Sequence, residues 1–225
     1  ILVHSVTAWI FGLEIAKEGW YSAIMAPIFV ASACDSGLAL LMVVLAAVRK
    51  AGVFDCGREL FANLARLLAT FIAVDAFFIG CELLTTAYPG TEGASHVLGI
   101  MTSGATAPFF WFEILGGLLI PFVLLASAKR RERTGVVVAA SALVMCGVFC
   151  KRVWLLFTSF TVTNVYGAPG ISSGSTAARG ADGFDMWALA GSYMPQPVEF
   201  AVVAAVVSFC ILGIALLSKK LVAKA

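Results

Sequence analysis

The chain has 225 residues, of which 61% are hydrophobic and only 12% are charged. Because a soluble domain carries about 25% charged residues, this composition excludes an ordinary soluble protein and indicates a polytopic protein of the lipid bilayer. The formal net charge of +2 gives no reason to expect a nucleic-acid partner.

Six apolar segments follow one another along the chain. The first, residues 1–12, is shorter than the ~20 residues that a membrane span needs, and we interpret it as the end of a helix that begins before Ile1. Five longer segments each predict a complete span, over about residues 22–48, 59–85, 107–128, 134–160 and 198–218. The predicted fold is therefore an all-α, polytopic transmembrane helical bundle with five full spans and a partial N-terminal one.

These segments divide into two predicted parts. Residues 1–50 are expected to end a first bundle, and residues 51–225 to form a second, complete four-helix bundle. Two longer connections, 88–106 and 161–197, fall on the same side of the predicted membrane. The second is rich in Gly, Ser and Ala, and a loop of that length in a compact protein is usually functional or disordered. We expect it to be a cap that touches a partner or covers a site.

Basic residues are distributed unequally between the two ends of the predicted spans. Only Lys17 and Arg179 fall in loops at one end. Ten fall at the other end: Arg49, Lys50, Arg58, Lys129, Arg130, Arg131, Arg133, Lys219, Lys220 and Lys224. Cytoplasmic loops of membrane proteins carry such an excess. We therefore expect a cytoplasmic C-terminus and place both long connections outside.

Four of the five spans carry charge far from their ends, at Asp35, Asp75, Glu113 and the adjacent pair Lys151 and Arg152. With a rise of ~1.5 Å per residue, each lies about 21–27 Å from the basic end of its helix. The sequence thus predicts one layer of acids and bases in the outer half of the membrane. Charge at such depth is energetically expensive and usually marks a path for ions, protons or substrate.

Two interpretations of this layer remain open, and they are compatible. The charges can neutralise one another as buried ion pairs that specify packing, with Asp35 making a structural hydrogen bond to a neighbouring helix. Alternatively, the carboxyl groups can form a chain of titratable groups that passes protons. Because Lys151 and Arg152 are adjacent, they point ~100° apart on a helix, so that one can face the bundle interior while the other points elsewhere.

The residues that commonly hold redox centres are sparse. The two histidines, His4 and His96, do not form the intramembrane pair that haem b requires, and the six cysteines form no CxxC motif or Cys/His cluster. We therefore expect no haem and no iron–sulfur centre in this chain. Any electrons would pass through an organic carrier or through another subunit.

Several short motifs, taken in order, resemble the NrfD/PsrC family of polysulfide reductase NrfD-like integral membrane subunits. They are His4-Ser5-Val6, Gly19-Trp20-Tyr21-Ser22, Ala26-Pro27-Ile28-Phe29-Val30-Ala31-Ser32-Ala33, Ser36-Gly37-Leu38-Ala39, Phe110-Trp111-Phe112-Glu113 with the later Pro121, and Lys151-Arg152-Val153 with Thr158-Ser159. The stretch from Asp35 to Leu40 looks most like members found in sulfite-reduction-linked and molybdopterin-linked complexes.

The resemblance implies two four-helix bundles, an exchangeable menaquinone or ubiquinone, and an iron–sulfur, ferredoxin-like partner subunit docked on the outer face, with a further catalytic subunit. It also implies a bacterial or archaeal cytoplasmic membrane. By position, Asp35 and His4 are the residues that can belong to the family's quinol site in the first bundle. Asp75, Glu113 and the Lys151–Arg152 pair then belong to the second bundle, with a proton-handling or structural role.

Our leading hypothesis is a quinol-interacting membrane anchor of a respiratory oxidoreductase complex, without a catalytic site of its own. It would pass electrons between the quinone pool and the iron–sulfur partner, while buried carboxylates handle the protons. The alternatives are an ion-coupled secondary transporter that uses the charged layer for substrate binding, and a purely structural anchor. The sequence shows no convincing pair of broken helices, which argues against the transporter.

Overall fold

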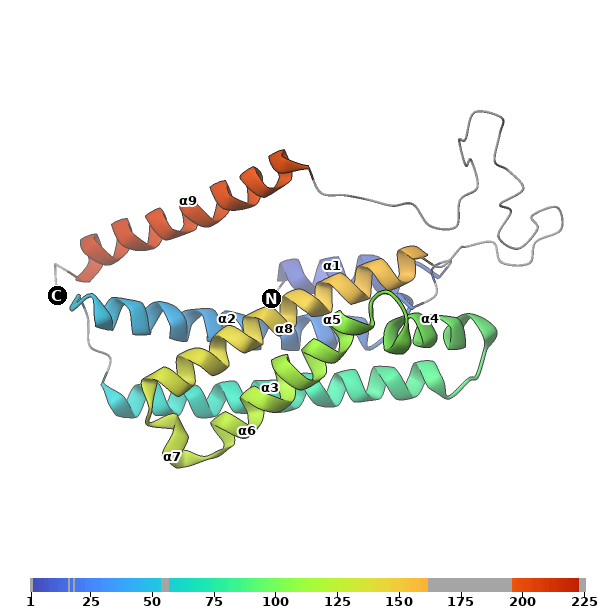
Figure 1. Cartoon of the computed structure of the whole chain (residues 1–225), viewed down its shortest axis with the longest axis horizontal. Helices are drawn as coiled ribbons and strands as arrows, with labels where there is room; N and C mark the ends of the chain where they lie inside the picture. Colours follow the sequence, from blue (N-terminus) through green and yellow to red (C-terminus); the bar gives the residue numbers. More distant parts are fainter. Residues whose placement is uncertain (1, 16, 18, 54–56, 162–195, 223–225) are drawn as a thin grey trace.

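The computed structural model describes residues 2–15, 17, 19–53, 57–161 and 196–222, and these residues contain helices but no strands. The elements in order are α1 (Leu2–Gly12), α2 (Met25–Lys50), α3 (Arg58–Ala87), α4 (Glu92–Ser103), α5 (Ala107–Trp111), the π-helix η1 (Phe112–Leu119), α6 (Ile120–Ala126), α7 (Ala128–Arg131), α8 (Thr134–Thr161) and α9 (Pro197–Val222). Figure 1 shows the long helices lying side by side along the longest axis of the molecule.

The predicted spans are confirmed. Within the described residues, five helical stretches are long and apolar enough to cross a membrane: Met25–Lys50, Arg58–Ala87, Ala107–Ala126, Thr134–Ser159 and Pro197–Leu217. The third of them is built from α5, η1 and α6 in succession. The N-terminal helix α1 is too short to span, as expected. The protein is therefore an all-α, polytopic membrane bundle.

One predicted connection contains a helix. Residues 88–106 were expected to be a loop, yet α4 occupies most of that segment. The Thr91 side chain caps this helix by accepting a hydrogen bond from the backbone N–H of Ala94 at 3.3 Å. Val97 and Met101, four residues apart, are buried against the bundle. A capping residue and one apolar face thus suffice for a short helix that lies across the end of the spans.

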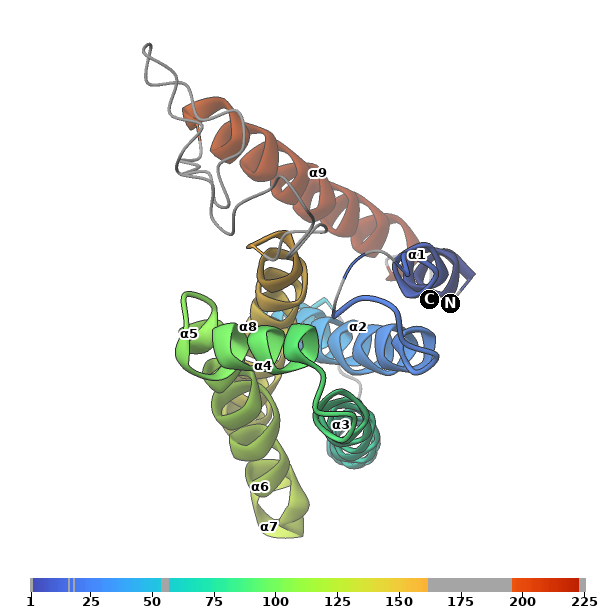
Figure 2. The ribbon, with the colours of Figure 1, turned by 90° about the vertical axis from the view of Figure 1, so that its right-hand side faces the viewer.

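The bundle is held together around α2, α3 and α8. Helix α2 packs against both α3 and α8, while η1 and α6 pack against α8 and α3. Figure 2 shows these helices grouped around one core when they are seen from the α4 end. Lipid is as apolar as the side chains, so close packing rather than the hydrophobic effect holds such helices together.

Helix α9 differs from the others because it lies apart from this group (Figures 1 and 2). None of its span is buried within the described structure. Helix α2, which ends the predicted first part, packs closely against α3 and α8 of the predicted second part. The division at residue 50 therefore remains a prediction, as does the second four-helix bundle over residues 51–225. Most of the predicted outer loop, residues 162–195, lies outside the described residues.

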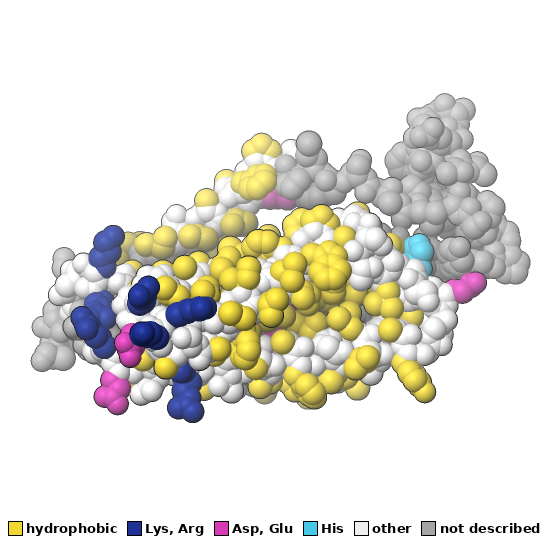
Figure 3. Space-filling view, turned by 60° about the horizontal axis from the view of Figure 1, so that its bottom comes forward, with side chains coloured by type: hydrophobic (Ala, Val, Ile, Leu, Met, Phe, Trp, Pro, Cys, Tyr) yellow, Lys and Arg dark blue, Asp and Glu magenta, His cyan; other side chains and the backbone are white. Residues whose placement is uncertain are grey.

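The two ends of the bundle differ in charge. Lys and Arg side chains gather at one end in Figure 3, where α2 ends and α3 begins. This basic end carries Arg49, Lys50, Arg58 and the α7 region. The opposite end, called the α4 end below, carries α4, the end of α3 and the end of α8.

Candidate functional site

Lys151 on α8 is the centre of a buried ion cluster. Its Nζ donates hydrogen bonds to Oδ1 and Oδ2 of Asp75 on α3, at 2.9 and 2.7 Å. The same Nζ lies 3.3 Å from Oε1 of Glu113 on η1. All three side chains are almost completely buried. Three residues of the predicted layer of charge are thus in direct contact, and each comes from a different helix.

Glu113 is held on a π-helix. Its Oε2 accepts a hydrogen bond from the indole Nε1–H of Trp154, which lies on α8 near Lys151. A π-helix closes its hydrogen bonds over five residues instead of four, and such segments occur frequently at functional sites. Pro121, shortly after η1, has no backbone N–H, so a carbonyl one turn earlier loses its usual donor. The helix that carries Glu113 is thus irregular just before Pro121, where it forms the π-helix Phe112–Leu119.

The register of η1 against α8 depends on two glycines. A Cβ added to Gly117 would lie 2.6 Å from the Cα of Gly147, and one added to Gly147 would lie 2.5 Å from the Cα of Gly117. Real Cβ atoms do not approach that closely, so η1 and α8 touch backbone to backbone at this crossing. Small residues permit such contacts between membrane helices. The crossing lies one helical turn from Glu113 on η1 and one from Lys151 on α8.

Asp35 on α2 joins the cluster from the other side. Its side chain is completely buried, and neither carboxylate oxygen accepts a hydrogen bond from a described residue. It is close enough to Asp75 and Lys151 to interact electrostatically with both. A buried carboxyl without a hydrogen-bond donor is costly unless it carries a proton or meets a water or ligand.

Arg152 faces away from Lys151, as the helical geometry predicts. Its guanidinium carbon lies 3.9 Å from the centre of the Phe29 ring on α2, and its Nη2 lies 3.5 Å from the Ser32 hydroxyl. Its charge still interacts with the carboxyl groups of Asp35, Asp75 and Glu113. The cluster therefore contains three carboxyl groups and two bases, so one acid group is not neutralised by a base.

The structure brings together five of the six residues that the sequence singled out. The sixth, His4, is exposed on α1. Their functional roles remain predictions. Within the described residues, no group of three or more His, Cys, Asp and Glu side chains could hold a metal ion. The expected absence of haem and iron–sulfur centres likewise remains a prediction.

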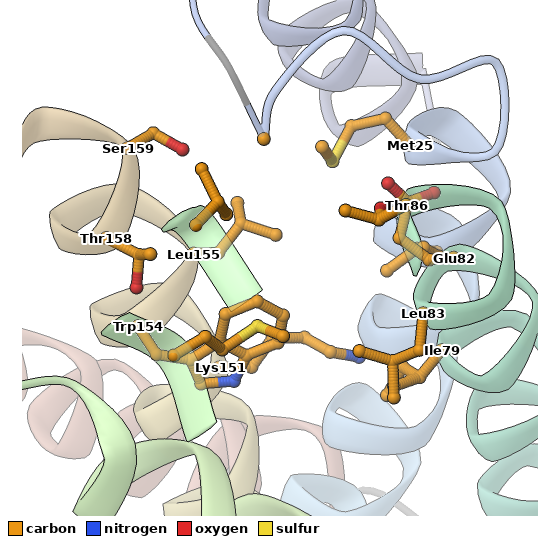
Figure 4. Close-up of a pocket in the computed structure, with 14 residues that line it drawn as sticks. Met25, Ile79, Glu82, Leu83, Thr86, Lys151, Trp154, Leu155, Thr158 and Ser159 are labelled. Carbon is orange, nitrogen blue, oxygen red and sulfur yellow. The ribbon is translucent and has the colours of Figure 1, made fainter. Parts of the chain in front are cut away.

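A cavity lies on the α4 side of the cluster, and Lys151 is one of its lining residues (Figure 4). It has a volume of about 40 Å³ and lies between α2, α3, α4 and α8. Lys151 crosses its floor beside Trp154, while Glu82 and Thr86 of α3 line the opposite side from Thr158 and Ser159 of α8. Small-molecule sites usually measure ≈ 300–1,000 Å³. This cavity therefore suits water and not a quinone ring.

Glu82 was missed by the reasoning from sequence. It lies close to the end of the second predicted span, where a charged residue can be an ordinary boundary residue. The signal that could have found it is the apolar run on both sides, Phe77 to Leu84. In the structure it is half-buried, and its Oε2 accepts a hydrogen bond from the Ser22 hydroxyl at 2.5 Å.

Comparisons with known proteins identify the family. The family model described as "Polysulphide reductase, NrfD" matches residues 1–164. The chain belongs to the NrfD family. The match covers α1 to α8 and includes every residue of the ion cluster.

Three curated relatives of this NrfD-family chain are named as parts of oxidoreductases. The putative dimethyl sulfoxide reductase membrane subunit of Halobacterium salinarum is 35% identical over 92% of this chain and 47% of its own length. A selenate reductase subunit of Mesobacillus selenatarsenatis is 29% identical over 79% of this chain and 40% of its own length. The Hdr-like menaquinol oxidoreductase integral membrane subunit of Archaeoglobus fulgidus is 27% identical over 69% of this chain and 40% of its own length. The chain thus spans less than half of the length of these relatives.

Proposed function

We propose that this NrfD-family chain is a quinol-interacting part of a membrane anchor subunit, which exchanges electrons between the menaquinone or ubiquinone pool and an iron–sulfur partner. The observation that carries the proposal is the ion cluster inside the spans, formed by Asp35, Asp75, Glu113, Lys151 and Arg152. One relative is named as a menaquinol oxidoreductase membrane subunit. The alternative transporter hypothesis has no such support.

The chemistry of quinol explains why a buried acid cluster is needed. Oxidation of a quinol releases two protons for every two electrons, and a nearby proton acceptor makes the loss of each electron much more favourable. Asp35 is the cluster residue whose oxygens accept no hydrogen bond within the described structure. An unpaired buried acceptor fits an O–H donor. We assign Asp35 the first proton, with His4 as the other candidate at the quinol site.

The remaining cluster residues handle the proton after its release. Lys151 holds Asp75 and lies next to Glu113, so these carboxyl groups can exchange protons without leaving an isolated buried charge. Arg152 contributes positive charge from the α2 side. In this proposal the electrons of quinol pass to a partner subunit, and its protons pass to the ion cluster.

The proposal includes partners and an orientation. Electrons would pass directly from quinol to an iron–sulfur, ferredoxin-like subunit docked at the α4 end, with a further catalytic subunit beyond it. The excess of basic residues at the opposite end supports a cytoplasmic C-terminus. The setting is a bacterial or archaeal cytoplasmic membrane.

Titration of the purified full-length complex with a fluorescent quinol analogue tests the proposal. We expect saturable quenching of the analogue's fluorescence that menaquinol reverses by competition. The Asp35→Asn variant should bind the analogue more weakly. Glu59→Gln, which changes an exposed carboxylate at the basic end, is the matched control and should bind it normally. Quenching that is not saturable, or that menaquinol does not reverse, would contradict a quinol-binding function.

A further inference from the structure

Glu82 is a partly buried acid that the proposed function does not use. It lies in the membrane-spanning helix α3 and is hydrogen-bonded to Ser22, in the segment before α2. Within the described part of the chain it has no ion pair with a basic residue. A carboxyl group inside a span without a basic partner is energetically expensive and marks a functional position.

Glu82 stands where two hollows meet. The cavity above Lys151 is lined by Glu82, Thr86 and Gly19 among others. The same three residues also line a second hollow of about 390 Å³ at the α4 end. That hollow is bordered by exposed residues, including Tyr21 and Thr91. Glu82 therefore lies between a surface hollow and a cavity that reaches Lys151 of the ion cluster, and it is the titratable one of the three shared residues.

The internal cavity has the size and the polar groups that a short chain of water needs. Each water requires about 10–15 Å³ of such space, so a volume of about 40 Å³ accommodates roughly three. Lys151 at the floor, Thr158 and Ser159 on α8, and Glu82 at the far side provide hydrogen-bonding partners (Figure 4). The remaining walls are mostly apolar, which prevents the protons from leaving sideways.

The length of the path agrees with this number of waters. Asp75 does not line the cavity, but its carboxylate is held by Lys151 at the floor. Glu82 follows Asp75 by seven residues on α3, so the floor and Glu82 are separated by ~10.5 Å along the helix axis. Three waters between two groups make four hydrogen bonds, and at about 2.8 Å each these cover about 11 Å. A proton cannot cross that distance in one transfer, but it can pass along such a chain.

We propose that the cavity between α2, α3, α4 and α8 is a water-filled proton path from the buried ion cluster to the α4 end, and that Glu82 exchanges the protons with the outside. This inference rests on the proposed function for the source of the protons. For each proton that the Glu82 carboxylate accepts from the water on the cluster side, it releases one to water in the surface hollow. Only O–H bonds change, and no electron moves along this path.

Hydroxyl-radical footprinting of the intact complex tests for the water itself. Radicals formed from internal water oxidise the nearest methionine to its sulfoxide. Met25 and Met101 line the cavity and are 1% and 4% exposed, whereas Met42 is 0% exposed in the apolar core. We expect Met25 and Met101 to be oxidised several times faster than Met42. Equal protection of all three would overturn the water path, whether or not the complex binds quinol.

Proton release tests the role of Glu82. In proteoliposomes that contain the intact complex, a trapped or external pH dye reports on which side the protons of quinol oxidation appear. We expect Glu82→Gln to slow this release by about tenfold or more, as removal of a proton-transfer group does, and Glu82→Asp to restore most of it. The exposed Glu92 on α4 provides a matched control, because Glu92→Gln changes a carboxylate at the same end outside both hollows.

The two measurements separate the possible failures. The assignment of Glu82 would be overturned if the Glu82→Gln complex oxidises quinol normally and still releases its protons at the α4 end at the normal rate. If the unmodified complex does not bind the quinol analogue, the proposed function is refuted instead. Footprinting then still decides whether the cavity holds water.

Discussion

Lys151 on α8 donates two hydrogen bonds to the carboxylate of Asp75 on α3, and both side chains are buried. The two residues are 76 positions apart in the chain. Their contact therefore fixes how α3 and α8 sit against each other. It also means that neither residue can be removed without leaving the other charge in a medium that solvates it poorly.

We expect Lys151→Met to lower the free energy of unfolding by about 3–5 kcal/mol, because Asp75 would remain as an uncompensated buried charge. The double variant with Asp75→Leu should recover much of this loss. Thermal or denaturant unfolding in detergent measures both. Arg66→Met, at an exposed position of α3, controls for loss of a base and should change the stability little. A double variant as unstable as the sum of the single variants would show that the pair is not coupled.

The charged layer could be predicted from sequence because it depends on one constant, the helical rise. Counting residues from the basic ends placed Asp35, Asp75, Glu113 and Lys151 at a common depth, and the structure brings them together. The different directions of Lys151 and Arg152 follow from the helical rotation of ~100° per residue. Local geometry was thus sufficient for depth and direction.

Features that depend on contacts between helices could not be predicted in this way. The π-helix at Glu113 and the cavity beside Glu82 arise where particular helices meet, and a single segment does not encode its neighbour. Gly117 and Gly147 are ordinary small residues in the sequence, yet they let the backbones of η1 and α8 touch. Helix α4 could not be predicted from hydropathy, because a short amphipathic helix across the bundle end has the mixed polar and apolar composition of a loop.

The Gly117–Gly147 crossing predicts a strong effect of a single methyl group. Gly117→Ala places a Cβ against the backbone of α8, and relieving such a clash costs about 1–3 kcal/mol or more. The shift would also move Glu113 away from Lys151. Gly80→Ala is the matched control, since a Cβ there meets nothing within 4 Å. Comparison of the melting temperatures of the two variants measures the effect, and equal temperatures would contradict the close crossing.

Trp154 predicts a separate, smaller effect on Glu113. Trp154→Phe keeps an aromatic ring beside Phe110 but removes the indole N–H that donates a hydrogen bond to Glu113. We expect the stability to fall by about 1–3 kcal/mol, the cost of an unsatisfied buried acceptor. Trp111→Phe removes an indole N–H that donates to the Thr102 carbonyl at an exposed site. We expect this variant to lose less stability than Trp154→Phe. The reverse order in chemical unfolding experiments would argue against the Trp154–Glu113 bond.

The orientation of the bundle is testable at two exposed carboxylates. In a background without native cysteines, Glu92→Cys lies at the α4 end and Glu132→Cys lies at the basic end. Because basic loops stay in the cytoplasm, a membrane-impermeant thiol reagent added to whole cells should label position 92 and spare position 132. Labelling of position 132 alone would reverse the orientation and place the Glu82 hollow on the cytoplasmic side.

Asp35 provides the sharpest test of the proton chemistry. It is completely buried, and neither oxygen accepts a hydrogen bond from a described residue, so the neutral isostere in Asp35→Asn should fold and assemble normally. Asparagine cannot accept the proton of a quinol, and loss of such a group slows proton transfer by ~100-fold or more. We therefore expect quinol turnover by the assembled complex to fall by at least about tenfold, with the partner subunits present in normal amounts on a native gel. Normal turnover in an assembled Asp35→Asn complex would move the first proton acceptor to another residue, and His4→Ala would then be the variant that loses activity.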